Sequence, residues 1–204
     1  MRHSGFLIVL FGLLFIAVGC SNSQNDDLAI KTTTDYGKEA ARRVEKSGDC
    51  EYSETGYTNS NYGFSFKYPN NWSIRTDLPT DTTIAVAVTR NDAIGNTTPI
   101  LGIHVDKADP KLLETRKSEF EREFQSTSLS NVKFLAFEQG KLSDQDTLFV
   151  RYTTVTEDNK RRECAQYIFN NQNKCYTLTF FSPQENEQVQ REMDAILATF
   201  KIGQ

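Results

Sequence analysis

The sequence predicts an α+β domain in which an antiparallel β-sheet is flanked by two main helices. Several segments alternate apolar and polar residues, which is the period of a half-buried strand. Short turn-rich segments join these runs, so consecutive strands are expected to pair as hairpins. Two other segments carry apolar residues at helical spacing, and such helices cover the face of a sheet.

The first predicted strand begins at Tyr62, where Phe64, Phe66 and Tyr68 alternate with polar residues. A Pro-Asn-Asn turn follows and leads into a second strand that starts at Trp72. We predict that Trp72 is buried and structural, because aromatic residues at strand spacing more often form a core than line a ligand pocket. Further strands are predicted at residues 83–90, 100–106, 132–138, 147–156, 161–169 and 175–181.

The two predicted helices span residues 110–125 and 184–200. In the first, Leu113, Phe120 and Phe124 lie on one stripe. The second opens with Ser-Pro-Gln-Glu at residues 182–185, which has the pattern of a capping box with proline at the first helical position. Its apolar stripe is formed by Val189, Met193, Ile196, Leu197 and Phe200.

The first 19 residues have the organisation of a secretion signal. Arg2 and His3 precede an apolar run over residues 6–18 that is short for a membrane span, and the run ends in Ala-Val-Gly before Cys20. Residues 1–19 therefore resemble a bacterial lipoprotein signal peptide, which implies cleavage before Cys20 and acylation of its thiol. Acyl chains would hold the protein to a membrane without embedding it. The alternatives are an uncleaved N-terminal anchor and a soluble secreted form.

Residues 20–61 are predicted to form a flexible tether, because they contain few large aliphatic side chains that could offset the entropy of ordering. One short helix is predicted at residues 38–46. Ser21 is not the aspartate that retains lipoproteins at the inner membrane of enterobacteria. Residues 24–27 weakly resemble the acidic surface-export signals of Bacteroidetes lipoproteins. The localisation predicted is the cell envelope, with the outer membrane favoured over the inner.

Two motifs carry a resemblance to a known family. They are YGFSFKYPNNW at residues 62–72 and FFSP at residues 180–183, the latter followed by a helix ending in ILATFKI at residues 196–202. Residues 62–204 resemble the PsbP-like domain of bacterial lipoproteins and of the lumenal extrinsic subunit of photosystem II. The resemblance implies a sandwich of antiparallel sheet and helices. It also implies binding and assembly roles more than catalysis, and it transfers neither a catalytic motif nor a metal ligand.

Composition and histidine content exclude several classes of function. With 27 acidic and 23 basic residues, the chain lacks the basic surplus of a sequence-independent nucleic-acid binder. His104 is the only histidine after the leader, which excludes multi-histidine zinc centres, and we predict no metal and no cofactor. Because Leu101, Ile103 and Val105 form the apolar face of its strand, His104 faces the other side and is expected to be half-exposed.

Three cysteines remain after Cys20, so one internal disulfide at most can form. A hairpin turning at residues 170–174 sets Cys164 opposite Phe180 and Cys175 opposite Phe169, too far apart to bridge each other. We therefore predict that Cys50 pairs with Cys164 or Cys175. The alternative is three free thiols.

These observations predict a membrane-anchored lipoprotein with a non-catalytic binding or assembly role and an envelope protein as its partner. A second hypothesis is a carrier or sensor of a small apolar ligand, which requires a closed pocket of roughly several hundred cubic ångströms. A third is a hydrolase centred on His104, which requires this side chain in a cleft near a Ser, Thr or Asp.

Overall fold

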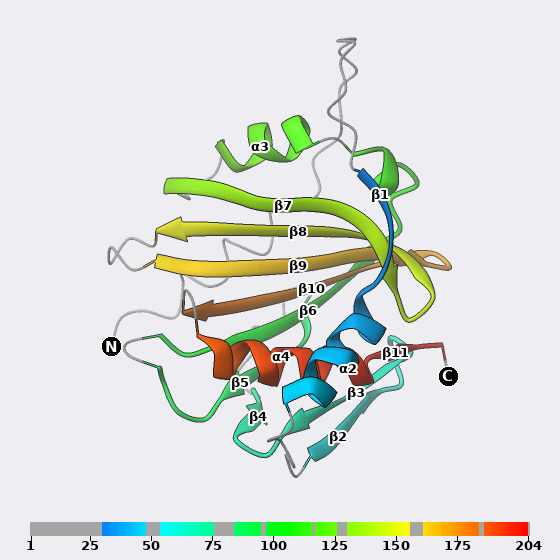
Figure 1. Ribbon diagram of the computed structural model, residues 1–204. Coiled ribbons are helices and arrows are strands. Elements are labelled where there is room, and N and C mark those ends of the chain that lie inside the picture. The colour runs from blue at the N-terminus through cyan, green and yellow to red at the C-terminus, as the bar shows by residue number, and fades with distance from the viewer. Residues whose placement is uncertain are drawn as a thin grey trace, which may run out of the picture.

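The computed structural model describes residues 30–47, 54–75, 84–94, 97–115, 117–125, 130–155, 161–183 and 186–203. Within these ranges the chain forms one eight-stranded sheet, one three-stranded sheet and three α-helices (Figure 1). The predicted leader, Cys20 and Cys50 lie outside the described residues. The α+β class predicted from the sequence is confirmed.

The large sheet follows the order β1-β7-β8-β9-β10-β6-β5-β4. Its strands from β4 to β10 lie where the alternating runs predict them, and every neighbouring pair among them is antiparallel. Consecutive strands β7, β8, β9 and β10 form a meander, because each connecting segment is short. The strand bounds are β4 Trp72–Ile74, β5 Ile84–Arg90, β6 Ile100–Lys107, β7 Ser130–Leu142, β8 Gln145–Val155, β9 Arg161–Asn171 and β10 Lys174–Pro183.

The prediction that residues 20–61 form a flexible tether is wrong for much of that range. Strand β1 (Ile30–Asp35) pairs in parallel with β7, and helix α2 (Tyr36–Ser47) packs on the sheet with Ala40 fully buried. Strand β2 (Glu54–Asn59) is also part of the domain. The short helix predicted at residues 38–46 is confirmed. Low hydrophobicity misled the prediction, because a strand at a sheet edge is held by backbone hydrogen bonds that composition does not report.

The junction of β1 and α2 is fixed by two local features. The side chain of Asp35 caps the helix by accepting a hydrogen bond from the Lys38 backbone nitrogen (3.0 Å). Burial opposes its ionisation, but the hydrogen bonds and charge of Lys38 lower the pKa of Asp35. On β7, a Cβ at Gly140 would collide with the carbonyl oxygen of Thr34 and would lie 2.7 Å from the Tyr36 ring. The absence of a side chain at Gly140 thus lets the N-terminal segment approach the sheet.

The β9–β10 hairpin turns one residue more tightly than the sequence analysis assumed. Asn171 pairs with Lys174, and Gln172 adopts a positive φ of 55° in the two-residue loop. Cys164 is therefore opposite Phe181 and Cys175 opposite Asn170, a shift of one position in the predicted register. The two cysteines remain too far apart along the hairpin to bridge each other.

The first predicted strand does not join the large sheet. Strand β3 (Phe64–Pro69) lies between β2 and the two-residue strand β11 (Lys201–Ile202) in a separate three-stranded sheet. Phe64 and Phe66 point inward and pack against Phe200, which follows helix α4 (Glu187–Thr199). The small sheet and α4 together cover one face of the large sheet.

Both predicted helices differ from expectation at their ends. Helix α4 starts at Glu187, where the Asn186 side chain accepts a hydrogen bond from the Val189 backbone nitrogen (2.9 Å). The predicted capping box is wrong, because residues 182 and 183 continue strand β10. The predicted helix over residues 110–125 is a 3₁₀ turn η1 (Leu112–Glu114) followed by α3 (Lys117–Gln125). Leu112 is buried and Leu113 is exposed.

The large sheet has a buried core on each face. One core lies between the sheet, α2, α4 and the small sheet. The second lies on the opposite face and includes Leu112 of η1 and Phe120 of α3. A strand of the central sheet is therefore covered on both sides, so alternation alone does not tell which residues reach solvent.

Candidate functional site

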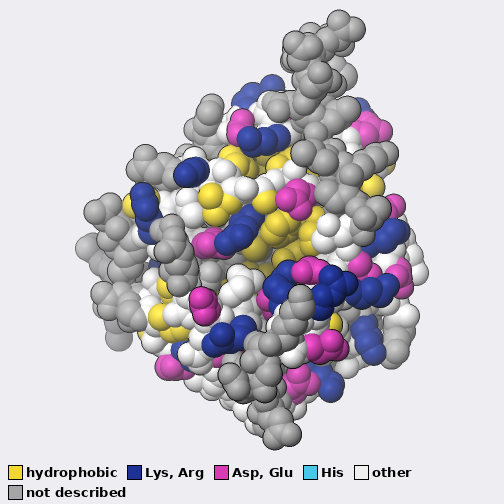
Figure 2. Space-filling model, viewed as in Figure 1, with side chains coloured by type: hydrophobic (Ala, Val, Ile, Leu, Met, Phe, Trp, Pro, Cys, Tyr) yellow, Lys and Arg dark blue, Asp and Glu magenta, His cyan; other side chains and the backbone are white. Residues whose placement is uncertain are grey.

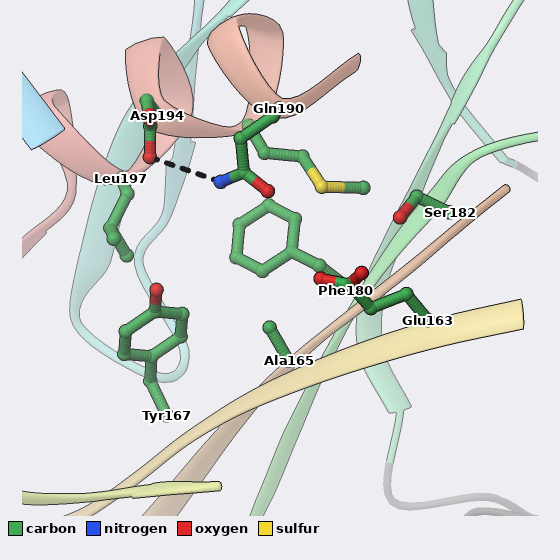
Figure 3. Close-up of a pocket in the computed structure, with 9 residues that line it drawn as sticks. Glu163, Ala165, Tyr167, Phe180, Ser182, Gln190, Asp194 and Leu197 are labelled. Carbon is green, nitrogen blue, oxygen red and sulfur yellow. Dashed lines mark hydrogen bonds between the residues drawn. The ribbon is translucent and has the colours of Figure 1, made fainter. Parts of the chain in front are cut away.

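A small pocket opens where helix α4 lies over strands β9 and β10. It encloses about 20 Å³, which is room for one group the size of a water molecule. Figure 3 shows side chains from both strands and from the helix converging on it. Its lining is formed by Glu163, Ala165, Tyr167, Phe180, Ser182, Gln190, Met193, Asp194 and Leu197.

An ion pair joins α2 to α4 beside this pocket. Arg43 donates from Nε and Nη2 to both carboxylate oxygens of Asp194, each at 2.7 Å. The Asp194 side chain is 3% exposed while that of Arg43 is 44% exposed, so the carboxylate is inside and the guanidinium outside. The hydrogen bond to Asp194 raises the pKa of Arg43 and keeps it charged. Gln190 also donates to Asp194, at 3.3 Å.

A second ion pair lies across strands β8 and β9. Arg151 donates from Nε to Oε1 of Glu163 at 2.6 Å, and this hydrogen bond raises the pKa of Arg151. The Arg151 side chain is again the exposed partner, at 45% against 11% for Glu163. Each pair therefore buries its carboxylate beside the pocket and presents its cation at the surface.

Tyr167 lies between the two ion pairs on the floor of the pocket. Burial raises the pKa of its phenol, with the charge of Asp194 acting in the same direction, so the hydroxyl stays protonated. The ring packs against Tyr36 and Phe149 at centroid distances of 5.4 and 4.9 Å. Figure 3 shows the hydroxyl directed towards α4.

The surface around the pocket carries hydrophobic side chains. Figure 2 shows them gathered over the central strands of this face, bordered by Lys, Arg, Asp and Glu. Phe149 and Ala165, which pack against the core on this face, are half-buried. Exposed apolar patches of this kind mark interaction surfaces in soluble domains.

A second pocket, of about 110 Å³, lies at the end of the small sheet. It is lined by the turn between β2 and β3 and by β11. Gly63, in this turn, has a φ of 73° and accepts a hydrogen bond from the Gly203 backbone nitrogen (3.0 Å).

The structure places His104 away from both pockets. It pairs with Thr177 of β10 and Ile84 of β5, and it is 4% exposed. The expectation of a half-exposed histidine is wrong, because the face opposite Leu101 and Ile103 belongs to the second core. Burial lowers the pKa of His104 to about 4, so the imidazole is neutral near pH 7.

We expect His104 to make the protein acid-labile. Its pKa is about 4 in the fold against 6.5 when unfolded, so the unfolded chain binds the proton more readily between these values. Stability is therefore fully present above pH 6.5 and falls by about 2–3 kcal/mol as the pH drops to about 4. Urea unfolding at pH 7 and pH 4.5 measures the loss of unfolding free energy. In His104→Gln, the part of this loss that comes from protonation of the imidazole should be absent. Equal pH dependence in both proteins would contradict the prediction.

Cys164 and Cys175 are both buried and form no disulfide with any described residue, and burial raises the pKa of each thiol. Because Cys50 lies outside the described residues, its pairing with either of them stays a prediction. Trp72 is 2% exposed, as predicted.

Sequence reasoning missed the four charged residues around the pocket. Arg151 and Glu163 are polar positions within the strands predicted at residues 147–156 and 161–169, and Asp194 lies in the predicted helix between Met193 and Ala195. An acidic residue beside the apolar stripe of α4 was the available signal. Among the described residues, no group of three or more His, Cys, Asp or Glu could hold a metal ion. No helix in the same ranges is long and apolar enough to cross a membrane.

Comparison with known proteins decides the family. A family model described as PsbP-like protein matches residues 12–202. The chain belongs to the PsbP-like family. This match extends N-terminal to the motifs at residues 62–72 and includes β1, α2 and β2 of the PsbP-like chain. No curated protein matches it.

Two solved structures, with TM-scores above 0.5, share the fold of the PsbP-like chain. The solution structure of cyanobacterial PsbP (CyanoP) from Synechocystis sp. PCC 6803 is 13% identical, with a TM-score of 0.52 over 76% of this chain and 96% of that one. LpqN from Mycobacterium tuberculosis, described as involved in cell envelope biogenesis, is 15% identical, with a TM-score of 0.51 over 80% and 96%. A structure from Bacteroides thetaiotaomicron VPI-5482 is 15% identical with a TM-score of 0.47 over 73% of this chain, which spans 48% of its length.

Proposed function

We propose that this chain is a lipid-anchored protein of the bacterial cell envelope that acts without catalysis. In this proposal it binds a protein partner and serves the assembly or maintenance of an envelope or membrane complex. The observation that carries it is the apolar sheet face around the α4 pocket, where Phe149 and Ala165 are half-buried and Arg43 and Arg151 present their guanidinium groups. Apolar surface with charged groups at its border is suited to a protein interface.

Two comparisons support this proposal. The chain belongs to the PsbP-like family, and the resemblance to that family implies binding and assembly roles. LpqN, which shares the fold, is described as involved in cell envelope biogenesis. A role at the envelope also agrees with the lipoprotein leader predicted from residues 1–19.

The two alternatives receive less support. A carrier of a small apolar ligand needs a pocket of roughly several hundred cubic ångströms. The two pockets described above enclose about 20 and 110 Å³. A hydrolase centred on His104 needs this side chain in a cleft, whereas it is 4% exposed on a central strand.

We predict that Cys20 is the lipidation site. Metabolic labelling with an alkyne fatty acid should mark the wild-type protein, and Cys20→Ser should abolish the label because it removes the acylated thiol. Cys164→Ser is the matched control, since that thiol is buried in the second core and should leave the label unchanged. Label persisting in Cys20→Ser would refute the prediction.

Partner binding is tested by comparing three variants in a strain that lacks the gene. Ala136→Asp places a charge on the face that carries Arg151, because Ala136 lies opposite Arg151 in the sheet. It should abolish both complementation and the crosslink formed by a photoreactive residue in place of the exposed Lys133, which lies on the same face. Leu113→Asp is its control, because Leu113 is exposed (38%) and lies on η1, which packs against the opposite face of the sheet. His104→Gln should complement. Loss of function in folded His104→Gln, with the crosslink intact, would overturn the proposal in favour of the hydrolase.

A further inference from the structure

The polar atoms that line the α4 pocket form a set of hydrogen-bond acceptors. Oε1 of Glu163 accepts a hydrogen bond from Arg151, and Oε2 has no hydrogen bond to the described residues. Gln190 uses its amide nitrogen on Asp194, which leaves its carbonyl oxygen, seen in Figure 3, on the pocket side. The Ser182 hydroxyl, from strand β10, completes the lining. Arg43 and Arg151 hold the carboxylates but do not line the pocket.

Tyr167 adds a polar group to the pocket. Its side chain is 7% exposed and lines the pocket, and no hydrogen bond joins its hydroxyl to another described residue. The hydroxyl is not among the fully buried polar atoms that lack a partner, so it is open to the pocket and not sealed in the core. A donor group that enters the pocket can therefore bond to this oxygen.

The size and walls of the pocket define what that group is. About 20 Å³ admits one group of the size of water or an ammonium ion, and it is too small for an acyl chain or a sugar ring. The Phe180 ring faces the pocket between Gln190 and Ala165 in Figure 3, and an aromatic face attracts a cation. Met193 and Leu197 supply an apolar wall along which an aliphatic chain can lie.

An anion is disfavoured here, because Glu163 and Asp194 both line the pocket and neither arginine does. A guanidinium is planar and larger than the space, whereas an ammonium is compact and donates three hydrogen bonds. We propose that the α4 pocket is a socket for the ammonium group of a lysine side chain presented by the protein partner. This inference rests on the proposed function and names the chemistry of the partner at its docking site.

The socket is tested with n-butylammonium chloride as a probe of the lysine side chain. The chain has two methionines, Met1 and Met193, so methyl-¹³C methionine places an NMR label in the pocket wall. In the full chain, n-butylammonium should shift the Met193 methyl signal saturably. n-Butanol and sodium butyrate at the same concentration and ionic strength should not. A saturable shift with butyrate, an equal shift with butanol, or no shift with butylammonium would overturn the socket.

Two variants test whether the acceptor side chains of the α4 pocket bind butylammonium. Glu163→Gln should weaken butylammonium binding about tenfold, because it removes the charged acceptor. Glu187→Gln is the matched control, because its side chain is 93% exposed on α4 and does not line the pocket, so binding should be unchanged. Ser182→Ala keeps the Arg151 ion pair and should weaken binding about threefold, which tests the site if Glu163→Gln misfolds. Equal weakening by Glu187→Gln would refute the assignment.

The partner experiment separates this inference from the proposed function. If the otherwise unchanged protein with the photoreactive residue at position 133 forms no crosslink, the proposed function fails even where butylammonium binds. If Glu163→Gln loses butylammonium binding but still forms the wild-type crosslink and complements, the partner does not use the socket. In that case this inference fails and the proposed function stands.

Discussion

Glu192→Ala is expected to destabilise the fold by about 3–5 kcal/mol, because it removes the buried counter-charge of the Arg90 guanidinium and leaves only the exposed Asp92 as its ion-pair partner. Glu192 is fully buried on α4, and Arg90 of β5 is 7% exposed. Nε of Arg90 donates to Oε2 of Glu192 at 3.0 Å. Urea unfolding measures the change in the free energy of unfolding.

The effect is large because four donors share this one carboxylate. Besides Arg90, the Trp72 indole donates to it at 2.8 Å, Asn71 at 2.8 Å and Gln188 at 3.1 Å. Strands β4 and β5 are thereby fixed to α4 by a single side chain. Removing it leaves several buried donors unpaired, and each costs about 1–3 kcal/mol when no water replaces the acceptor.

Glu187→Ala is the control for this prediction. It removes the same side chain from the first turn of α4, where it is 93% exposed and 3.9 Å from Arg191. An exposed pair of this kind contributes about 0–1 kcal/mol, so stability should hardly change. A similar small loss for Glu192→Ala would show that Glu192 is not the centre of the network.

Trp72→Ala is expected to cost a similar amount, about 3–5 kcal/mol, for a different reason. The indole is 2% exposed in the core between the sheet and α4, so its removal leaves a large cavity. Thermal or urea unfolding measures the loss, followed by far-UV circular dichroism because the variant has no tryptophan. An unchanged melting temperature would contradict burial.

Trp72→Phe separates the two parts of that loss. It keeps most of the apolar volume but removes the indole nitrogen that donates to Glu192 at 2.8 Å. We expect it to be less harmful than Trp72→Ala, with a residual cost of about 1–3 kcal/mol for the missing charge-assisted hydrogen bond. Equal losses in the two variants would show that packing contributes little.

The alternation of apolar and polar residues predicted most of the large sheet, because its strands are long and regular. The runs at residues 83–90 and 161–169, for example, appear as β5 and β9. Alternation did not distinguish exposed faces from covered ones, and this is why His104 was placed at the surface. The second core depends on η1 and α3, whose position above the sheet is a tertiary property.

The N-terminal elements were missed for a related reason. Strand β1 is polar, and its place beside β7 depends on the close approach allowed by Gly140, 105 residues after Asp35. The composition of residues 30–35 gives no indication of this contact with β7. The ion pair of Arg43 with Asp194 likewise joins residues 151 positions apart, so sequence spacing could not reveal the candidate site.

The early position of β1 sets how far the domain can move from the membrane. With acyl chains on Cys20, the predicted tether of residues 21–61 could reach about 140 Å from the bilayer when fully extended. Because β1 begins at Ile30, residues 21–29 separate the domain from Cys20, and nine residues span at most about 30 Å. If Cys20 is acylated as proposed, so short a connection would confine the domain to the layer next to the lipid headgroups and raise its effective concentration there. Proteins that reach the α4 face would then be ones embedded in, or lying against, the same membrane.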